Sequence, residues 1–220
     1  MLTFEDIIKD DEINTIIKTA DRQLVEMGYT EHGYRHLGIV SRIAGEILTE
    51  LGYSERIIEL GKIAGYMHDI GNSINREDHA HTGALLAYNL LTKKGMSCED
   101  AAEVMMAIGN HDEKTGNPVS PISAALIIAD KSDVHRTRVR AGDESSRFDI
   151  HDRVNYAVED ANILIDKDNK KVVLQLKIDT KICPVIKYFE IFLDRMLMSK
   201  KAANYLNVWF GLEINGATLL

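Results

Sequence analysis

Apolar residues recur every three to four positions along most of the chain, which is the spacing of amphipathic helices. Prolines stand only at positions 118, 121 and 184, so little interrupts this pattern. Glycine marks the C-terminal ends of helices, and Ser, Asp or Pro marks their N-terminal ends. The predicted helices cover about residues 11–27, 31–51, 54–68, 78–95, 97–111 and a sixth segment from 120 onward.

The pattern changes after about Arg140. A polar stretch at 142–147 predicts a surface loop, and a short helical pattern then runs to about residue 160. The elements expected beyond it are two strands joined by a hairpin turn, a long helix and a third strand, at 161–165, 171–178, 184–207 and 208–214. The predicted fold class is therefore mainly α: a helical bundle with a small C-terminal antiparallel β-sheet and a long helix, an α+β tail.

Composition narrows the choice of function. The chain has 220 residues, 45% of them hydrophobic, and a net charge of −8, which is typical of a soluble acidic domain. This charge argues against general nucleic-acid binding. No apolar run approaches the ~20 residues that span a bilayer, and a basic leader is missing, so we expect a cytoplasmic protein without a membrane partner. The two cysteines form no Cys-x-x-Cys, which excludes a thiolate zinc cluster.

Histidine and aspartate carry the candidate chemistry. Five of the predicted helices begin or end a core-facing apolar stripe with side chains that can bind a metal ion. These side chains are His36, His68, Asp69, His79, His111 and Asp130. One histidine on an apolar face is usually an ordinary core residue, but a buried carboxylate is unfavourable unless it is paired or bound to a cation. No Lys or Arg lies on the same stripes, so we expect a divalent metal, or two.

Two details of the ligand set need a choice. His79 and His81 compete for the third histidine position, and we favour His79 because Gly83 stands one helical turn after it. A residue without a side chain at that point would let this helix approach the site closely. Mixed imidazole and carboxylate ligands favour Fe, Mn, Zn, Co or Ni over Cu(I), which prefers sulfur, and over Ca, which prefers oxygen.

The order of His36, His68-Asp69 and Asp130 resembles the His…His-Asp…Asp signature of the HD-domain metal-dependent phosphohydrolases. The segments at 79–84 and 107–111 are similar to the further histidine steps of members that hold two metals. The resemblance implies a dinuclear site bridged by Asp69, in a metal-binding core at about 25–140. We treat residues 1–220 as a single domain, with an extension at about 155–220. Some cyclic-dinucleotide phosphodiesterases of this class have a lysine where this chain has Asn72, so we do not expect that substrate.

The activity implied is hydrolysis of a small phosphoester or phosphoanhydride, in particular a nucleotide, by a metal-bridging hydroxide. Charge that develops on the phosphoryl oxygens calls for a nearby cation. Lys131, His135 and Arg138 would share one stripe of the helix that carries Asp130, unless this is a solvated face. We assign Asp69, Lys131 and Arg138 to catalysis, and Lys131, Asp133, Arg138 and His32 to substrate binding. An ion pair with Arg136 or Lys131 is the alternative for Asp133.

Two other functions stay open at this point. An HD-type di-iron oxygenase would use a similar ligand set to activate oxygen, and a non-catalytic module would only bind metal or a nucleotide. Residues 142–152 and the C-terminal sheet are expected to build the specificity pocket. A homo-oligomer also stays open.

Overall fold

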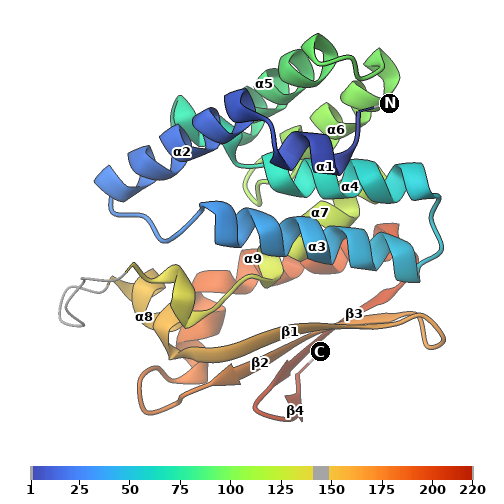
Figure 1. Ribbon diagram of the computed structural model, residues 1–220. Coiled ribbons are helices and arrows are strands. Elements are labelled where there is room, and N and C mark those ends of the chain that lie inside the picture. Colours follow the sequence, from blue (N-terminus) through green and yellow to red (C-terminus); the bar gives the residue numbers. More distant parts are fainter. Residues whose placement is uncertain (1, 141–148, 220) are drawn as a thin grey trace.

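The computed structural model describes residues 2–140 and 149–219 (Figure 1). The helices of its N-terminal part are α1 (Phe4–Ile8), α2 (Asp11–Glu26), α3 (Tyr34–Glu50), α4 (Glu55–Met67), α5 (His79–Lys93), α6 (Cys98–Gly109) and α7 (Pro121–Ser132), with a short 3-10 helix, η1 (Ile70–Ser73), between α4 and α5. The predicted helices match α2 to α6 closely. Helix α1 is an addition to them, and α7 ends earlier than expected.

Local capping explains most of the helix starts. Ser54, Ser97 and Ser120 each accept a hydrogen bond from the backbone N–H three residues later, at the N-termini of α4, α6 and α7. Pro121 occupies the first turn of α7, where its missing N–H is not needed. Asp78 stands at the start of α5 as predicted, but its side chain makes no capping bond and its φ is +58°.

The C-terminal part forms a mixed sheet. Its elements are η2 (Arg136–Arg138), α8 (Ile150–Ala157), β1 (Val158–Asp166), β2 (Lys171–Ile178), α9 (Val185–Tyr205), β3 (Trp209–Ile214) and β4 (Ala217–Thr218). Strands β1 and β2 pair antiparallel as the hairpin predicts, but β2 and β3 pair in parallel and β4 extends the sheet. The expectation of an antiparallel sheet is therefore wrong for β3, because α9 crosses over between two strands that run in the same direction.

The prediction of a mainly helical fold with a small C-terminal sheet is confirmed (Figure 1). Helix α9 contacts α7 on one side and β3 on the other, and one hydrophobic core runs from the bundle to the sheet. Residues 122–129 of α7 are buried all round, since α3, α4, α6 and α9 surround this helix. Asp130, near the end of α7, is thereby carried deep into the molecule.

Close helix packing prepares the site. A Cβ atom on Gly65 of α4 would come within 2.7 Å of the Ser41 Cα of α3, so only glycine allows these two helices to approach so closely. Gly83 of α5 packs against the backbone of His68 and Gly71, as we expect from its place one turn after His79.

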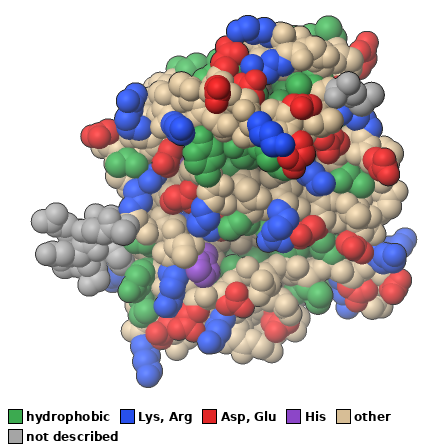
Figure 2. All heavy atoms as spheres, viewed as in Figure 1, with side chains coloured by type: hydrophobic (Ala, Val, Ile, Leu, Met, Phe, Trp, Pro, Cys, Tyr) green, Lys and Arg blue, Asp and Glu red, His purple; other side chains and the backbone are tan. Residues whose placement is uncertain are grey.

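The surface gives less information about partners. Positive and negative side chains are interspersed over the face shown in Figure 2. Within residues 2–140 and 149–219, no helix combines the length and the hydrophobicity needed to cross a lipid bilayer.

Candidate metal centre

Five helix ends converge on one buried point. His36 lies in the first turn of α3, His68 and Asp69 follow the last turn of α4, and His79 is the first residue of α5. His111 comes just after α6, and Asp130 lies near the end of α7. The imidazoles of His36, His68, His79 and His111 are all buried, as is the carboxylate of Asp69. The structure thus brings together the six residues singled out as metal ligands.

The first group of ligand atoms surrounds one oxygen of Asp130. Its Oδ1 lies 3.3 Å from His36 Nε2 and 3.7 Å from His68 Nε2. The two Nε2 atoms are 3.3 Å apart. Oδ2 of Asp69 faces the same group, 3.4 Å from His68 Nε2 and 3.8 Å from His36 Nε2. His36, His68 and Asp130 could therefore hold a metal ion.

The second group surrounds the other oxygen of Asp69. Its Oδ1 lies 3.5 Å from His79 Nε2 and 3.9 Å from His111 Nε2. Asn72 donates a hydrogen bond of 2.9 Å to the same oxygen and so holds the carboxylate in place. Asp69 therefore faces two groups of imidazoles with its two oxygens. His81 is not part of either group, since its side chain is 56% exposed and its Nδ1 faces Asp78.

The hydrogen bonds of the four imidazoles fit a metal site. Nδ1 lies 2.8 Å from the Gly65 carbonyl in His68, 3.0 Å from the Arg76 carbonyl in His79 and 2.6 Å from the Ile108 carbonyl in His111. A carbonyl oxygen can only accept, so Nδ1 carries the proton, which in a neutral ring leaves the Nε2 lone pair free. In His36 the acceptor is the carboxylate of Asp133, 2.7 Å away. All four Nε2 atoms are thus directed into the site, as in metal-bound histidines.

The charges of the site favour an added cation. Burial opposes ionisation of Asp69 and Asp130, yet the pKa of each lies well below its usual value because His68 attracts both and Lys131 attracts Asp130. Burial also opposes charge on His68, but the two carboxylates raise its pKa to about 10. Burial lowers the pKa of His111 well below its usual value. A divalent ion can supply the positive charge that His68 otherwise takes up as a proton.

The position of Lys131 differs from what the sequence predicts. Its Nζ lies 2.6 Å from Asp130 Oδ2 and 2.7 Å from Glu113 Oε2, and its side chain is buried. The expectation that no cation pairs with the carboxylates is therefore wrong for Asp130. Helical spacing points neighbouring residues apart, but the long lysine stem turns back. Oδ1 of Asp130 remains directed at His36 and His68.

The expected basic stripe does not form, because α7 ends at Ser132. His135 leaves the site and contacts Thr137 and the Glu159 carbonyl. Arg138 belongs to η2, yet its buried side chain returns toward the site, where Nη1 donates to the Asp133 carbonyl at 2.8 Å. Its Nε has no hydrogen-bond partner among the described residues.

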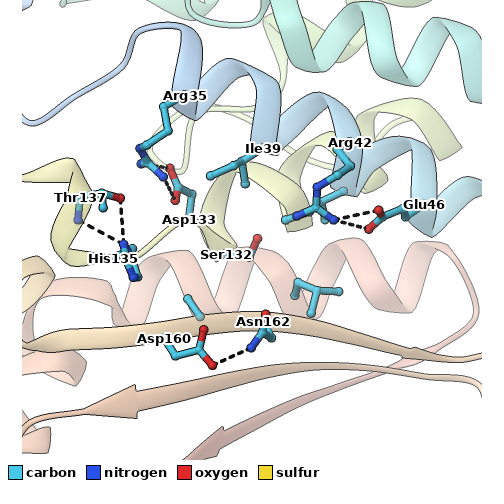
Figure 3. A pocket seen from close by; sticks show the side chains of 13 residues that line it. Arg35, Ile39, Arg42, Glu46, Ser132, Asp133, His135, Thr137, Asp160 and Asn162 are labelled. Atoms are coloured by element: carbon cyan, nitrogen blue, oxygen red, sulfur yellow. Dashed lines mark hydrogen bonds and ion pairs between the residues drawn. The ribbon is translucent and has the colours of Figure 1, made fainter.

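Asp133 lies behind His36. Its Oδ2 accepts the hydrogen bond from His36 Nδ1, and Arg35 grips its carboxylate (Figure 3). The alternative partners Arg136 and Lys131 bind elsewhere, to Glu159 and to Asp130. Asp133 thus contacts a candidate ligand and is not among the described residues that line the cleft.

A cleft of about 790 Å³ is lined by His79, one of the candidate ligands. His32 lines it, and burial lowers the pKa of this histidine well below its usual value. The basic residues of the cleft are Arg76, Lys114, Arg138 and Arg195. Arg76 Nη1 lies 3.8 Å from Asp69 Oδ1.

The walls of the cleft differ from the expectation. Residues 142–148 lie outside the described part of the chain, whereas Asp149, His151 and Asp152 line the cleft. The sheet, expected to contribute, is absent from the described lining, and Phe192 and Arg195 of α9 take its place. Helix α9 packs between the sheet and the bundle, so it reaches the cleft first. Sequence reasoning missed Arg76 and Arg195, because neither belongs to a helical stripe that carries a ligand.

One family model matches the part of the chain that contains these residues. Residues 33–137 match the family model of the HD domain, a range that includes all six candidate ligands. This part of the chain is thus an HD domain.

Its relatives extend over different shares of the chain. The uncharacterized protein MJ1020 of Methanocaldococcus jannaschii is 27% identical over 80% of this chain and 75% of its own length. Ribonuclease Y of Thermosipho melanesiensis is 30% identical over 58% of this chain, which spans 23% of that enzyme. A crystal structure of a predicted HD superfamily hydrolase from an uncultured Thermotogales bacterium is 29% identical, covers 56% of this chain and 67% of its own, and has a TM-score of 0.46.

Proposed function

We propose that this protein is a metal-dependent phosphohydrolase that cleaves a small phosphoester or phosphoanhydride, in particular a nucleotide. The observation that carries the proposal is the position of Asp69, whose two oxygens face two groups of imidazoles. One ion would be held by His36, His68, Asp69 and Asp130, and a second by Asp69, His79 and His111. A pair of divalent ions supplies a nucleophilic hydroxide near neutral pH and neutralises phosphoryl oxygens.

The residues of the cleft fit an anionic substrate. Arg138 is buried beside the site and its Nε–H makes no hydrogen bond to the residues that the structure describes, and Arg76 lies near Asp69. Both can donate hydrogen bonds to phosphate oxygens, whose negative charge grows during displacement. Lys131 is already bound by two carboxylates, so its proposed role is to hold Asp130 and not to touch the phosphate.

The size of the cleft supports a small substrate. About 790 Å³ falls within the roughly 300–1,000 Å³ of sites that bury drug-sized molecules, and a nucleotide is of that order. Ribonuclease Y is by its name an enzyme that acts on RNA, a phosphodiester, which supports the phosphoester class. Since this chain spans 23% of that enzyme, we keep the expectation that nucleic acid is not the substrate as a prediction.

The first experiment is elemental analysis of protein purified without added metal, followed by a screen of phosphate compounds with the metal found. The panel contains nucleoside mono-, di- and triphosphates, a dinucleoside polyphosphate and a short oligoribonucleotide. Asp69→Asn should lose both metal and phosphate release. His81→Ala is the matched control for metal content, because this histidine is exposed and contacts neither group, although it lines the cleft.

The same samples separate the competing functions. Release of phosphate or of a nucleotide product by the metal-loaded protein supports the proposal. Redox-active iron that consumes oxygen with an organic substrate would instead indicate an oxygenase. A ligand that binds at a stoichiometric ratio and is recovered unchanged would indicate a binding module. Absence of turnover across the panel at full metal occupancy refutes the hydrolase.

A further inference from the structure

We infer that Arg35 is a positioning residue of the metal centre: it holds Asp133 against His36 Nδ1 and thereby strengthens His36 as a ligand of the first ion. This inference rests on the proposed function only in that it requires a metal to bind. It concerns a residue outside the ligand set that lines a different cavity from the cleft.

The contacts form a continuous chain. Arg35 Nη2 lies 2.8 Å from Asp133 Oδ2 and Nη1 lies 3.2 Å from Oδ1, so the guanidinium binds the carboxylate through two donors (Figure 3). Its Nε donates to Glu31 Oε2 at 3.1 Å, which fixes the plane of the fork. Oδ2 of Asp133 in turn accepts from His36 Nδ1 at 2.7 Å.

His36 differs from the other three imidazoles in the group that accepts its Nδ1 hydrogen bond. His68, His79 and His111 donate to backbone carbonyls, whereas His36 donates to a carboxylate. A carboxylate behind a metal-bound imidazole fixes the ring and makes Nε2 a better electron-pair donor. The first ion should therefore depend on Asp133 in a way that the second ion does not.

A buried carboxylate can do this only if a cation compensates its charge. The side chain of Asp133 is 3% exposed, and two arginines flank it. Arg138 Nη1 lies 3.6 Å from Oδ2 and donates to the backbone carbonyl of the same residue. Arg35 makes the two shorter contacts. Lysine would keep the charge but lose the fork that matches a carboxylate.

A neighbouring cavity makes the inference testable by rescue. This α3–β1 cavity, of about 350 Å³, is lined by Arg35 and Asp133 together with Arg42, His135 and Asn162 (Figure 3). Truncation of Arg35 would open the cavity toward Asp133, so a free guanidinium ion could enter. Arg42 lines the same cavity but binds Glu46 at 2.8 Å and does not contact Asp133, which makes Arg42→Ala the matched control.

The experiment titrates metal-free wild type, Arg35→Ala, Arg35→Lys and Arg42→Ala with Mn²⁺ or Co²⁺ by calorimetry. Histidine ¹H–¹⁵N correlation spectra identify which rings bind each ion. We expect Arg35→Ala to weaken the ion bound by His36 about tenfold, at the lower end of the range for such partners. The ion at His79 and His111 should keep its affinity. Arg35→Lys should lose less affinity for the ion at His36, and Arg42→Ala should bind both ions like wild type.

Guanidinium chloride at low, non-denaturing concentration should restore the metal affinity of Arg35→Ala. It should not change the metal affinity of Arg42→Ala. Sodium chloride at equal ionic strength is the salt control. The inference is overturned if Arg35→Ala binds both ions like wild type, or if both ions weaken together. If Arg35→Ala does not fold, the comparison of Arg35→Lys with Arg42→Ala decides in the same way. Failure of wild type to bind metal would refute the proposed function as well, whereas wild-type turnover with an unaffected Arg35→Ala refutes this inference alone.

Discussion

Lys131→Met should destabilise the metal-free protein strongly, because it removes the cation that two carboxylates share. Methionine has nearly the shape of the lysine stem, so packing changes little. Asp130 Oδ2 and Glu113 Oε2, 2.6 and 2.7 Å from Lys131 Nζ, would then lie near each other with no positive charge between them. The perturbation is therefore mainly electrostatic.

Two routes give a similar magnitude for the loss of unfolding free energy. Breaking a buried ion pair by removing one partner is unfavourable by about 3–5 kcal/mol. Independently, burial opposes charge on Glu113, but Lys131 and Arg195 lower its pKa from 4.5 to about 2. That lowering corresponds to about 3 kcal/mol at about 1.36 kcal/mol per pKa unit, and Lys131 and Arg195 share it. We expect a loss of about 3 kcal/mol at neutral pH.

The assay is urea unfolding with a chelator and again with bound metal. Metal should restore part of the loss, because an ion neutralises Asp130 but not Glu113, and adding Glu113→Gln to the variant should restore another part. Since the pKa of Glu113 is lowered, its contribution is present above pH 4.5 and is lost toward pH 2, so the variant and wild type should converge in acid. Lys114→Met, at an exposed position, is the control. A loss below about 1 kcal/mol, typical of exposed pairs, would refute the reasoning.

Two further predictions concern the metal centre. His79→Ala should lower the metal content from two ions to one, because it removes an imidazole that faces Asp69 Oδ1. The control His81→Ala should keep both ions. Equal metal content of the two variants by elemental analysis would contradict the assignment of His79. For the metal-free protein, the pKa of His68 is raised from 6.5 to about 10 against the effect of burial, so its protonated form stabilises the fold fully below pH 6.5 and this contribution is lost as the pH rises to about 10. Thermal unfolding across this range should show the loss with a chelator and not with bound metal, and identical profiles would count against a metal that replaces this proton.

Much of the bundle could be predicted from local signals. The starts of α4, α6 and α7 follow from serines that cap their own helices. The apolar stripes predict which face of each helix is buried, and so which histidines point inward. The early end of α7 could not be predicted this way, because the residues after Ser132 contain no glycine or proline before residue 140. Contacts of Asp133 with Arg35 and His36, almost a hundred residues away, accompany the change of direction.

The remaining differences have the same origin. The turn residues between β1 and β2 indicate a hairpin, so these two strands could be predicted from the sequence. The parallel pairing of β3 depends on where α9 returns the chain, which no local pattern states. The cleft wall likewise depends on the path of α9, because Arg195 of this helix lines the cleft together with residues of the bundle.

The amino-acid sequence by itself determined the helices, their buried faces and the kinds of ligand at their ends, because these depend on neighbours within a few positions. The tertiary structure alone decided that the two oxygens of Asp69 face different imidazoles, that Lys131 turns back to Asp130 and that Arg35 stands behind His36. Each of these depends on distances of a few ångströms between segments far apart in the chain. Such distances arise only when the helices pack against one another.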